Sequence, residues 1–256
     1  MKIHKREDLS RLAYCLASVF CLLFFLNGCA KTQIQQKAAF DPEKYISDAD
    51  KLIDDKNYDE ARKILIEVKN RDITKRYAPL AHLKIADSYI KEGDLDIGIE
   101  EYSRFLELYP DNQYAFYAQY QIAMAYFSQI ESPDRGAGAA QRALQEFLKF
   151  KRLYPRNPYR EAVELRIERA RNVIADGEFL VGEFYYKKGS YNAALVRLEG
   201  LLREFPDYKR TDEVLILVGR SYKALKMQDK AKDAFRILIE KYPTSRFVSE
   251  AKKELN

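Results

Sequence analysis

The sequence repeats one pattern of side chains four times with identical spacing. Each copy has a small residue, two large apolar residues after it, and then an aromatic residue followed by proline. The copies are Gly98, Tyr102, Phe105, Tyr109-Pro110; Ala143, Phe147, Phe150, Tyr154-Pro155; Ala194, Leu198, Leu201, Phe205-Pro206; and Ala231, Phe235, Leu238, Tyr242-Pro243. Steps of four, three and four residues keep these side chains on one face of a helix. Proline then ends the helix, because it lacks an N–H and restricts the residue before it.

Each predicted helix follows another apolar helix, and turn signals such as 92–94 and 188–190 separate the two. A degenerate fifth copy without the proline lies upstream at Ala61, Leu65 and Val68. Helical hairpins with this signature resemble the tetratricopeptide repeat, whose period is about 34 residues. One hairpin cannot bury its own apolar face, so the hairpins must stack. We therefore predict an all-α, tetratricopeptide-like helical-hairpin solenoid of about five repeats over residues 42–256.

Two repeats are longer than the others, because the four prolines are 45, 51 and 37 residues apart. We expect the first enlargement to be a loop over 128–141 and the second to be a long helix over about 159–187. That helix would join two halves of the solenoid. The apolar stripe predicted along one of its faces is Val163, Ile167, Ala170, Ile174, Gly177, Val181 and Phe184.

Residues 1–28 have the features of a lipoprotein signal peptide. A polar start precedes an apolar run over 12–26, which ends at Asn27-Gly28-Cys29. The run is shorter than the roughly 20 apolar residues that span a membrane, and it is typical of a secretory signal. Residues 26–29 resemble a bacterial lipobox, in which the cysteine is acylated and becomes the new N-terminus.

We therefore expect lipidation at Cys29, followed by a lipidated tether over 29–41. By resemblance to Gram-negative lipoproteins, Ala30 in place of Asp after the cysteine indicates the periplasmic face of the outer membrane. The alternative is a plain signal anchor in which Cys29 is a free thiol.

The charges and the reactive residues favour a binding protein. The chain has 44 basic and 39 acidic residues without a dense basic block, which gives no support to nucleic-acid binding. After residue 28 the sequence has one histidine, His82, and a lone histidine makes neither a metal site nor a catalytic triad. We expect His82 to have a surface or packing role and 136–138 to be a flexible turn. The sequence predicts no catalytic residues, no metal and no cofactor.

The chain as a whole resembles the BamD family, lipoproteins of the outer-membrane β-barrel assembly machine. The stretches that carry the resemblance are 114–126, Asp134-Arg135, 181–186, 191–194 and 197–206.

This resemblance implies three kinds of partner: the barrel insertase BamA, other lipoproteins of the machine, and unfolded outer-membrane proteins. Arg197 matches the family's contact arginine, and its guanidinium suits a bidentate carboxylate of the insertase. Arg197 and Glu199, in the Arg-x-Glu-Gly motif, are therefore the expected partner-binding residues. The alternatives for Arg197 are a structural ion pair with Glu199 or Glu204, or a solvated charge.

The family also implies a groove in the N-terminal repeats for the C-terminal targeting strand of unfolded barrel proteins. That strand ends in an aromatic residue, so an aromatic-lined groove suits it. The candidates are Tyr77, Tyr89, Tyr114 and Tyr117, and each is equally compatible with a core position.

Two other functions are compatible with parts of the pattern. A secretin pilotin or a scaffold for peptidoglycan enzymes would share the lipobox and the solenoid but would lack the Arg197-x-Glu199-Gly200 segment. A lytic transglycosylase would need an additional catalytic domain, for which the repeats leave no room.

Overall fold

The structure, a computed structural model, describes residues 40–255 apart from the side chain of Asp134. This part of the chain forms helices and contains no strand, which confirms the all-α prediction. The helices are α2 (Pro42–Asp54), α3 (Tyr58–Arg71), α4 (Ala78–Glu92), α5 (Leu95–Leu108), α6 (Ala115–Ser128), α7 (Pro133–Leu153), α8 (Arg160–Lys187), α9 (Tyr191–Glu204), α10 (Thr211–Ala224), α11 (Gln228–Lys241) and α12 (Val248–Leu255). The predicted signal peptide, Cys29 and residues 29–39 of the predicted tether lie outside the described residues.

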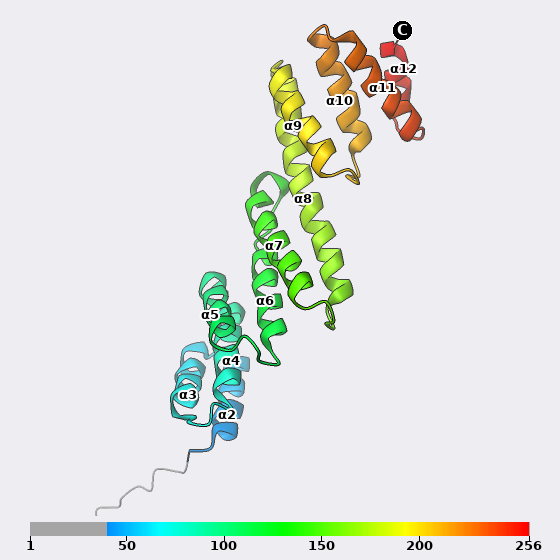
Figure 1. Cartoon of the computed structure of the whole chain (residues 1–256). Coiled ribbons are helices and arrows are strands. Elements are labelled where there is room, and N and C mark those ends of the chain that lie inside the picture. The colour runs from blue at the N-terminus through cyan, green and yellow to red at the C-terminus, as the bar shows by residue number, and fades with distance from the viewer. Residues whose placement is uncertain (1–39, 256) are drawn as a thin grey trace, which may run out of the picture. The chain divides into compact units, whose positions relative to one another are not determined.

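Each helix packs mainly against its neighbours in sequence (Figure 1). The helices form five hairpins, α2–α3, α4–α5, α6–α7, α8–α9 and α10–α11, and α12 packs against α11. The prediction of a tetratricopeptide-like fold with about five repeats is confirmed.

The repeated small and large residues form the core of these hairpins. Of these fifteen residues, fourteen are exposed by 2% or less, and the remaining one, Gly98, is also buried. In the four hairpins that carry the proline, the second helix ends one residue before the aromatic–proline pair. The aromatic residue still donates its N–H to a helical carbonyl, as Tyr109 does to Phe105. The proline after it has no N–H to continue the ladder, so the helix stops there.

His82 is fully buried, so its role is packing and the surface alternative was wrong. Its Nε2 lies 2.9 Å from Oε2 of Glu101, and its ring makes edge contacts with Phe105 and Tyr109. Burial lowers the pKa of His82 below its usual value and so favours the neutral ring.

The predicted loop over 128–141 was wrong in its second half, because α7 begins at Pro133 and includes Gly136-Ala137-Gly138. Proline is favoured in the first turn of a helix, and the alanines that follow are strong helix formers. Gly177 of α8 explains why the helix can continue here: a Cβ on Gly177 would lie 3.0 Å from the carbonyl oxygen of Pro133. The two helices therefore approach closely at this point.

The predicted long helix is confirmed, since α8 has 28 residues and packs against both α7 and α9. At 1.5 Å per residue it is about 42 Å long. The apolar stripe predicted along one face of α8 is buried over only part of its length. Val163, Ile167 and Ile174 are buried as expected, but Val181 is 38% and Phe184 54% exposed.

In the second half of α8 the buried positions are Ala175, Phe179 and Gly182. These residues face α9 and α10 rather than α7, because the helix changes packing partners halfway along. The face that carries the predicted apolar stripe is therefore buried in the first half of α8 and exposed toward its end.

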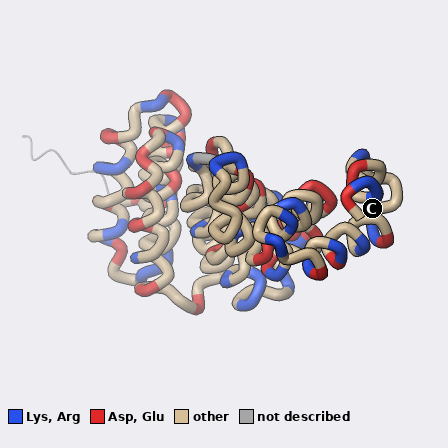
Figure 2. The backbone as a smooth tube through the Cα atoms, turned by 90° about the horizontal axis from the view of Figure 1, so that it is seen from above, with Lys and Arg blue, Asp and Glu red and all other residues tan. Residues whose placement is uncertain are grey.

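The surface of the helical domain is mixed in charge. Acidic and basic residues are interspersed along the helices (Figure 2). Over the described residues, no helix combines the length and the apolar character that crossing a bilayer requires.

Candidate partner-binding sites

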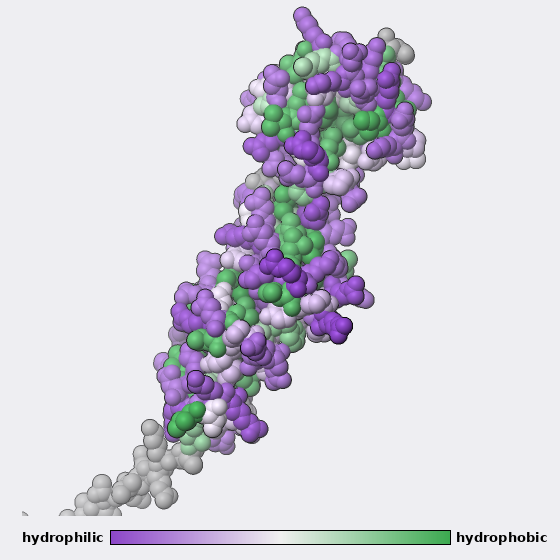
Figure 3. Space-filling model, in the orientation of Figure 1, coloured by the Kyte–Doolittle hydropathy of each residue, from purple (hydrophilic) through white to green (hydrophobic). Residues whose placement is uncertain are grey.

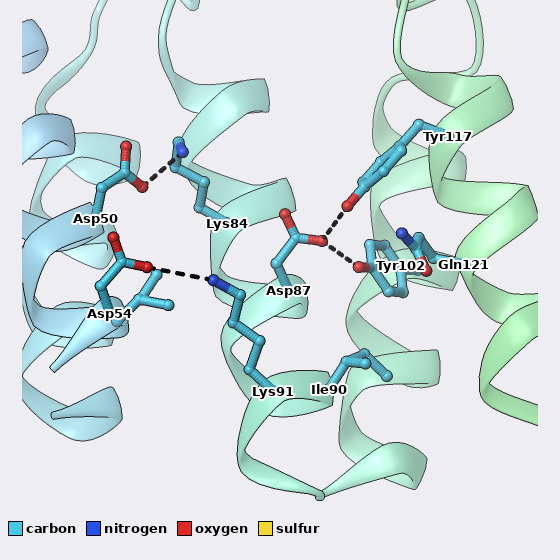
Figure 4. Close-up of a pocket in the computed structure, with 10 residues that line it drawn as sticks. Asp50, Asp54, Lys84, Asp87, Ile90, Lys91, Tyr102, Tyr117 and Gln121 are labelled. Atoms are coloured by element: carbon cyan, nitrogen blue, oxygen red, sulfur yellow. Dashed lines mark hydrogen bonds and ion pairs between the residues drawn. The ribbon is translucent and has the colours of Figure 1, made fainter. Parts of the chain in front are cut away.

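A cleft of about 500 Å³ lies among the helices of the first three hairpins. Its walls come from α2, α4, α5 and α6 (Figure 4). The charged and polar side chains that line it are Asp50, Asp54, Lys84, Asp87, Lys91, Tyr102, Tyr117 and Gln121. Ion pairs cross from α4 to α2: Lys84 lies 2.6 Å from Asp50, and Lys91 lies 3.6 Å from Asp54.

Asp87 lies at the centre of this cleft. Its Oδ1 accepts hydrogen bonds from the hydroxyls of Tyr102 and Tyr117, the latter at 2.9 Å (Figure 4). Burial raises the pKa of Asp87 above its usual value, although both tyrosine hydrogen bonds act in the opposite direction. Burial and the neighbouring carboxylate also raise the pKa of both tyrosines, so both hydroxyls remain donors. The three side chains hold α4, α5 and α6 together beneath the cleft.

The four tyrosines predicted for this groove do not share one surface. Tyr117 lines the cleft, and Tyr114 lies three residues earlier, exposed, in the N-cap position of α6. Tyr77 is in the N-cap position of α4, and its hydroxyl donates to Glu43. Tyr89 lies under the guanidinium of Arg62, 4.2 Å from the ring centre.

The charged residues of the cleft were not among the predicted site residues, although the sequence contains a signal for them. Lys84, Asp87 and Lys91 are three and then four residues apart, so they lie on one face of α4. The rest of that helix is largely apolar and buried. A charged stripe on such a helix indicates a polar surface that the neighbouring helices leave open.

Arg197 lies on α9, where that helix packs closely against Gly182 of α8. A Cβ on Gly182 of α8 would lie 2.5 Å from Leu198 Cδ2 and 3.5 Å from Arg197 Cβ. The guanidinium Nη1 lies 3.2 Å from Oε2 of Glu178, and the Arg197 side chain is 48% exposed. An exposed pair of this kind contributes about 0–1 kcal/mol, so Arg197 retains the capacity to bind another carboxylate.

The alternative of an ion pair with Glu199 or Glu204 of the same helix was wrong, since Arg197 pairs with Glu178 of α8. Glu199 is directed toward α10, where it accepts a hydrogen bond from Tyr222. Burial and this hydrogen bond raise the pKa of Tyr222 to about 12. Residues two apart on a helix point in different directions, so Arg197 and Glu199 belong to different surfaces.

No group of three or more His, Cys, Asp or Glu residues that could hold a metal ion occurs among the described residues. The two candidate sites therefore offer charges, hydroxyls and apolar surface, which suit the binding of polypeptides.

A family model described as "YfiO: Outer membrane lipoprotein" matches residues 39–236 of the chain. The chain belongs to this family. The match covers the first four hairpins and most of the fifth, so it includes both the cleft and Arg197.

Several relatives have the name outer membrane protein assembly factor BamD. The one from Neisseria gonorrhoeae is 25% identical over 235 residues, which cover 88% of each chain. The one from Caulobacter vibrioides is 27% identical over 212 residues, 83% of this chain and 69% of the relative. The Rickettsia prowazekii protein is 23% identical over 241 residues, 94% and 96% of the two chains. The prediction of a BamD-family chain is confirmed.

Solved structures that are similar include tetratricopeptide proteins. The TPR2AB-domain:pHSP90-complex of yeast Sti1 has a TM-score of 0.47 at 13% identity, over 80% of this chain and 78% of that one. TTC0263 from Thermus thermophilus has a TM-score of 0.36 at 17% identity, over 84% and 99% of the two chains.

Proposed function

We propose that this protein is a lipid-anchored periplasmic scaffold of the outer-membrane β-barrel assembly machine. The observation that carries the proposal is the family match over 39–236, together with relatives named as outer membrane protein assembly factors. The arrangement of helical hairpins suits this role, because stacked hairpins offer continuous surfaces to other polypeptides. The function is binding, and no catalytic step is part of it.

The barrel insertase binds through Arg197 in this proposal. The side chain is half exposed and held in place by Glu178, so its position on α9 is restricted before a partner arrives. A planar guanidinium can bind a carboxylate with two parallel hydrogen bonds, which gives direction as well as attraction. Glu199 supports this region from the other side of α9 through its hydrogen bond with Tyr222.

The cleft of the first three hairpins is the proposed site for segments of unfolded barrel proteins. Tyr117 offers a ring edge, and the ammonium groups of Lys84 and Lys91, each paired with an aspartate of α2, have further N–H donors for a chain terminus. Of the four tyrosines, Tyr117 is the one that lines the cleft, so it is the residue to which we assign client contact. Tyr114 could extend the surface, whereas Tyr77 and Tyr89 pack against other elements.

Acylation at Cys29 is the proposed means of attachment to the periplasmic face of the outer membrane. This part of the proposal depends on the lipobox-like residues 26–29 and on the description of the matching family.

Co-purification from detergent-solubilised outer membranes tests the contact with the insertase. The full-length chain is captured, and the barrel-inserting subunit is identified and quantified by mass spectrometry. We expect Arg197→Glu to reduce its yield by about tenfold, since reversing the charge of a contact arginine opposes the partner's carboxylate. Arg236→Glu on α11 is the control, because Arg236 is also exposed and also forms an ion pair, in this case with Asp233 of its own helix. Equal yields from the two variants would reject the assignment of Arg197.

Binding of a labelled peptide tests the client site separately. The peptide has the sequence of the C-terminal strand of an outer-membrane barrel, and its affinity is measured by fluorescence anisotropy. We expect Tyr117→Ala to weaken binding several-fold, in the range found for aromatic contacts. Tyr89→Phe serves as the control, since that ring lies outside the cleft and under Arg62. Unchanged affinity of Tyr117→Ala would exclude the cleft as the client site.

A further inference from the structure

The second half of α8 exposes large apolar side chains on one face. Leu180 and Val181 are each 38% exposed, and Phe184 is 54% exposed. Single exposed apolar residues are common on protein surfaces and need no explanation. Here the three residues border one depression of about 310 Å³, so they form a continuous surface. We call this depression the α7–α8 pocket.

The remaining wall of the α7–α8 pocket comes from the start of α7. Pro133, Ala137 and Gln141 line it, and a Cβ on Gly177 of α8 would lie 3.0 Å from the carbonyl oxygen of Pro133, so the two helices approach closely here. This surface is left open because α8 turns its buried face toward α9 and α10 in its second half. Figure 3 shows hydrophobic surface between hydrophilic groups in the region of α7 and α8.

The α7–α8 pocket is continuous with the site of Arg197. Glu178 is one of the pocket's lining residues, and it is also the ion-pair partner of Arg197. A polypeptide that reaches the guanidinium of Arg197 therefore also lies against the rim of the pocket. The guanidinium of Arg197 and the apolar α7–α8 pocket therefore lie side by side on one surface.

The charges around the α7–α8 pocket favour an acidic partner. The ammonium of Lys188 lies 5.7 Å from the ring centre of Phe184, and the guanidinium of Arg197 lies against Glu178, which lines the pocket. Glu178 is already paired with Arg197, and Glu183 is paired with Lys187. The positive charge of Lys188 and the remaining guanidinium donors of Arg197 are thus available to a partner's carboxylate.

We propose that the α7–α8 pocket receives an apolar side chain of the barrel insertase, from the same segment whose carboxylate binds Arg197. The inference rests on the proposed function and adds Val181 and Phe184 to the proposed interface with the insertase. Interfaces concentrate their affinity in a few side chains that fill desolvated pockets, with charged contacts at the rim. The apolar pocket supplies affinity in this arrangement, and Arg197 supplies orientation.

Affinity measurements with the purified insertase in detergent test this pocket. Val181→Asp and Phe184→Asp place a charge in the pocket, and Leu165→Asp is the control, since Leu165 is 68% exposed on the first half of the same helix. We expect each pocket variant to weaken the affinity by at least about tenfold and the control to change it less than twofold. Circular dichroism verifies that all variants keep wild-type helicity.

Photo-crosslinking in cells provides a second readout that does not depend on folding of the charged variants. A benzophenone amino acid replaces Phe184 in the full-length chain, and the same amino acid at Leu165 is the control. We expect the crosslink from position 184 to contain the barrel insertase and the control to lack it.

The possible results distinguish a failure of the pocket's proposed role from a failure of the proposed function. If the wild-type chain does not bind the insertase, the proposed function fails and the pocket's role fails with it. If the wild-type chain binds and Arg197→Glu weakens binding while both pocket variants bind normally, the pocket alone is rejected. A crosslink from position 184 to a second copy of this chain, or to a barrel client, would also overturn the pocket's assignment to the insertase.

Discussion

Arg197 of α9 forms an ion pair with Glu178 of α8, with 3.2 Å between Nη1 and Oε2, at the rim of an apolar pocket. The pair is intramolecular, yet Arg197 is also the residue that we propose for the contact with the insertase. This arrangement predicts that a charge swap separates the two roles. Arg197→Glu combined with Glu178→Arg keeps an ion pair within the chain but places the positive charge on the wrong helix.

We expect the charge-swapped double variant to melt within a few degrees of the wild type, since exposed pairs contribute about 0–1 kcal/mol. We expect it to bind the insertase as poorly as Arg197→Glu alone. Thermal melting and affinity are measured for the wild type, Arg197→Glu, Glu178→Arg and the double variant. These four proteins form a complete double-mutant cycle. Full recovery of affinity in the double variant would show that Arg197 serves only to pair with Glu178.

Close packing at Gly182 predicts that one added methyl group lowers the stability of the fold considerably. A Cβ at this position would lie 2.5 Å from the side chain of the fully buried Leu198, so in Gly182→Ala either that side chain or α9 must shift. Overpacking of this kind costs about 1–3 kcal/mol. Urea denaturation measures the loss in the free energy of unfolding.

Gly138→Ala is the matched control for Gly182→Ala. A Cβ at Gly138 meets nothing within 4 Å, and the residue lies inside α7. Alanine in a helix interior is more favourable than glycine by about 1 kcal/mol. We therefore expect this variant to be as stable as the wild type or more stable, and losses of equal size in the two variants would contradict the packing argument.

Most of the fold could be predicted from the sequence because one local pattern determines both burial and helix ends. The small residue and the two large residues of each repeat are buried, and the prolines follow the helix ends, as the spacing indicated. The start of α7 could not be predicted in the same way. Gly136 and Gly138 favour a turn when considered alone, whereas packing against Gly177 of α8 favours a helix there.

The sites were less predictable than the fold, because they depend on which helix faces are left uncovered. Periodicity placed Val181 and Phe184 on the apolar stripe of α8, but the helix exchanges one packing partner for another and leaves both exposed. Arg197 pairs with a residue 19 positions away on another helix. No spacing rule within one helix identifies such a contact.

Burial of Asp87 predicts a pH dependence of stability. The pKa of Asp87 in the folded chain is raised above 3.8, so its contribution is complete below that value and is lost as the pH rises through the raised pKa. Asp87→Asn keeps an acceptor for Tyr102 and Tyr117 but does not titrate. We expect the stability of the variant relative to the wild type to increase as the pH rises from acidic to neutral.

Chemical denaturation of both proteins at a series of pH values checks the prediction for Asp87. Tyr117→Phe is measured in the same pH series, because it removes one of the two hydroxyl donors to Asp87 and leaves the carboxyl group in place. A stability difference between wild type and Asp87→Asn that does not vary with pH would contradict the assigned titration.

Lipidation at Cys29 predicts that membrane attachment depends on this thiol. We expect Cys29→Ser to prevent acylation, so that the protein is recovered in the soluble periplasmic fraction or remains as the uncleaved precursor. Fractionation followed by mass spectrometry of the N-terminus distinguishes these forms. Normal retention of the serine variant in the outer membrane would show that another feature anchors the chain.

The most direct measurement is the amount of folded β-barrel protein in the outer membrane after this chain is depleted from its bacterium. Folded barrels are separated from unfolded ones by their different mobility before and after heating. The scaffold role predicts that folded barrels decrease as the chain is lost, that a plasmid copy restores them, and that the Arg197→Glu copy restores them poorly. Undiminished folded barrels in fully depleted cells would contradict a role in barrel assembly.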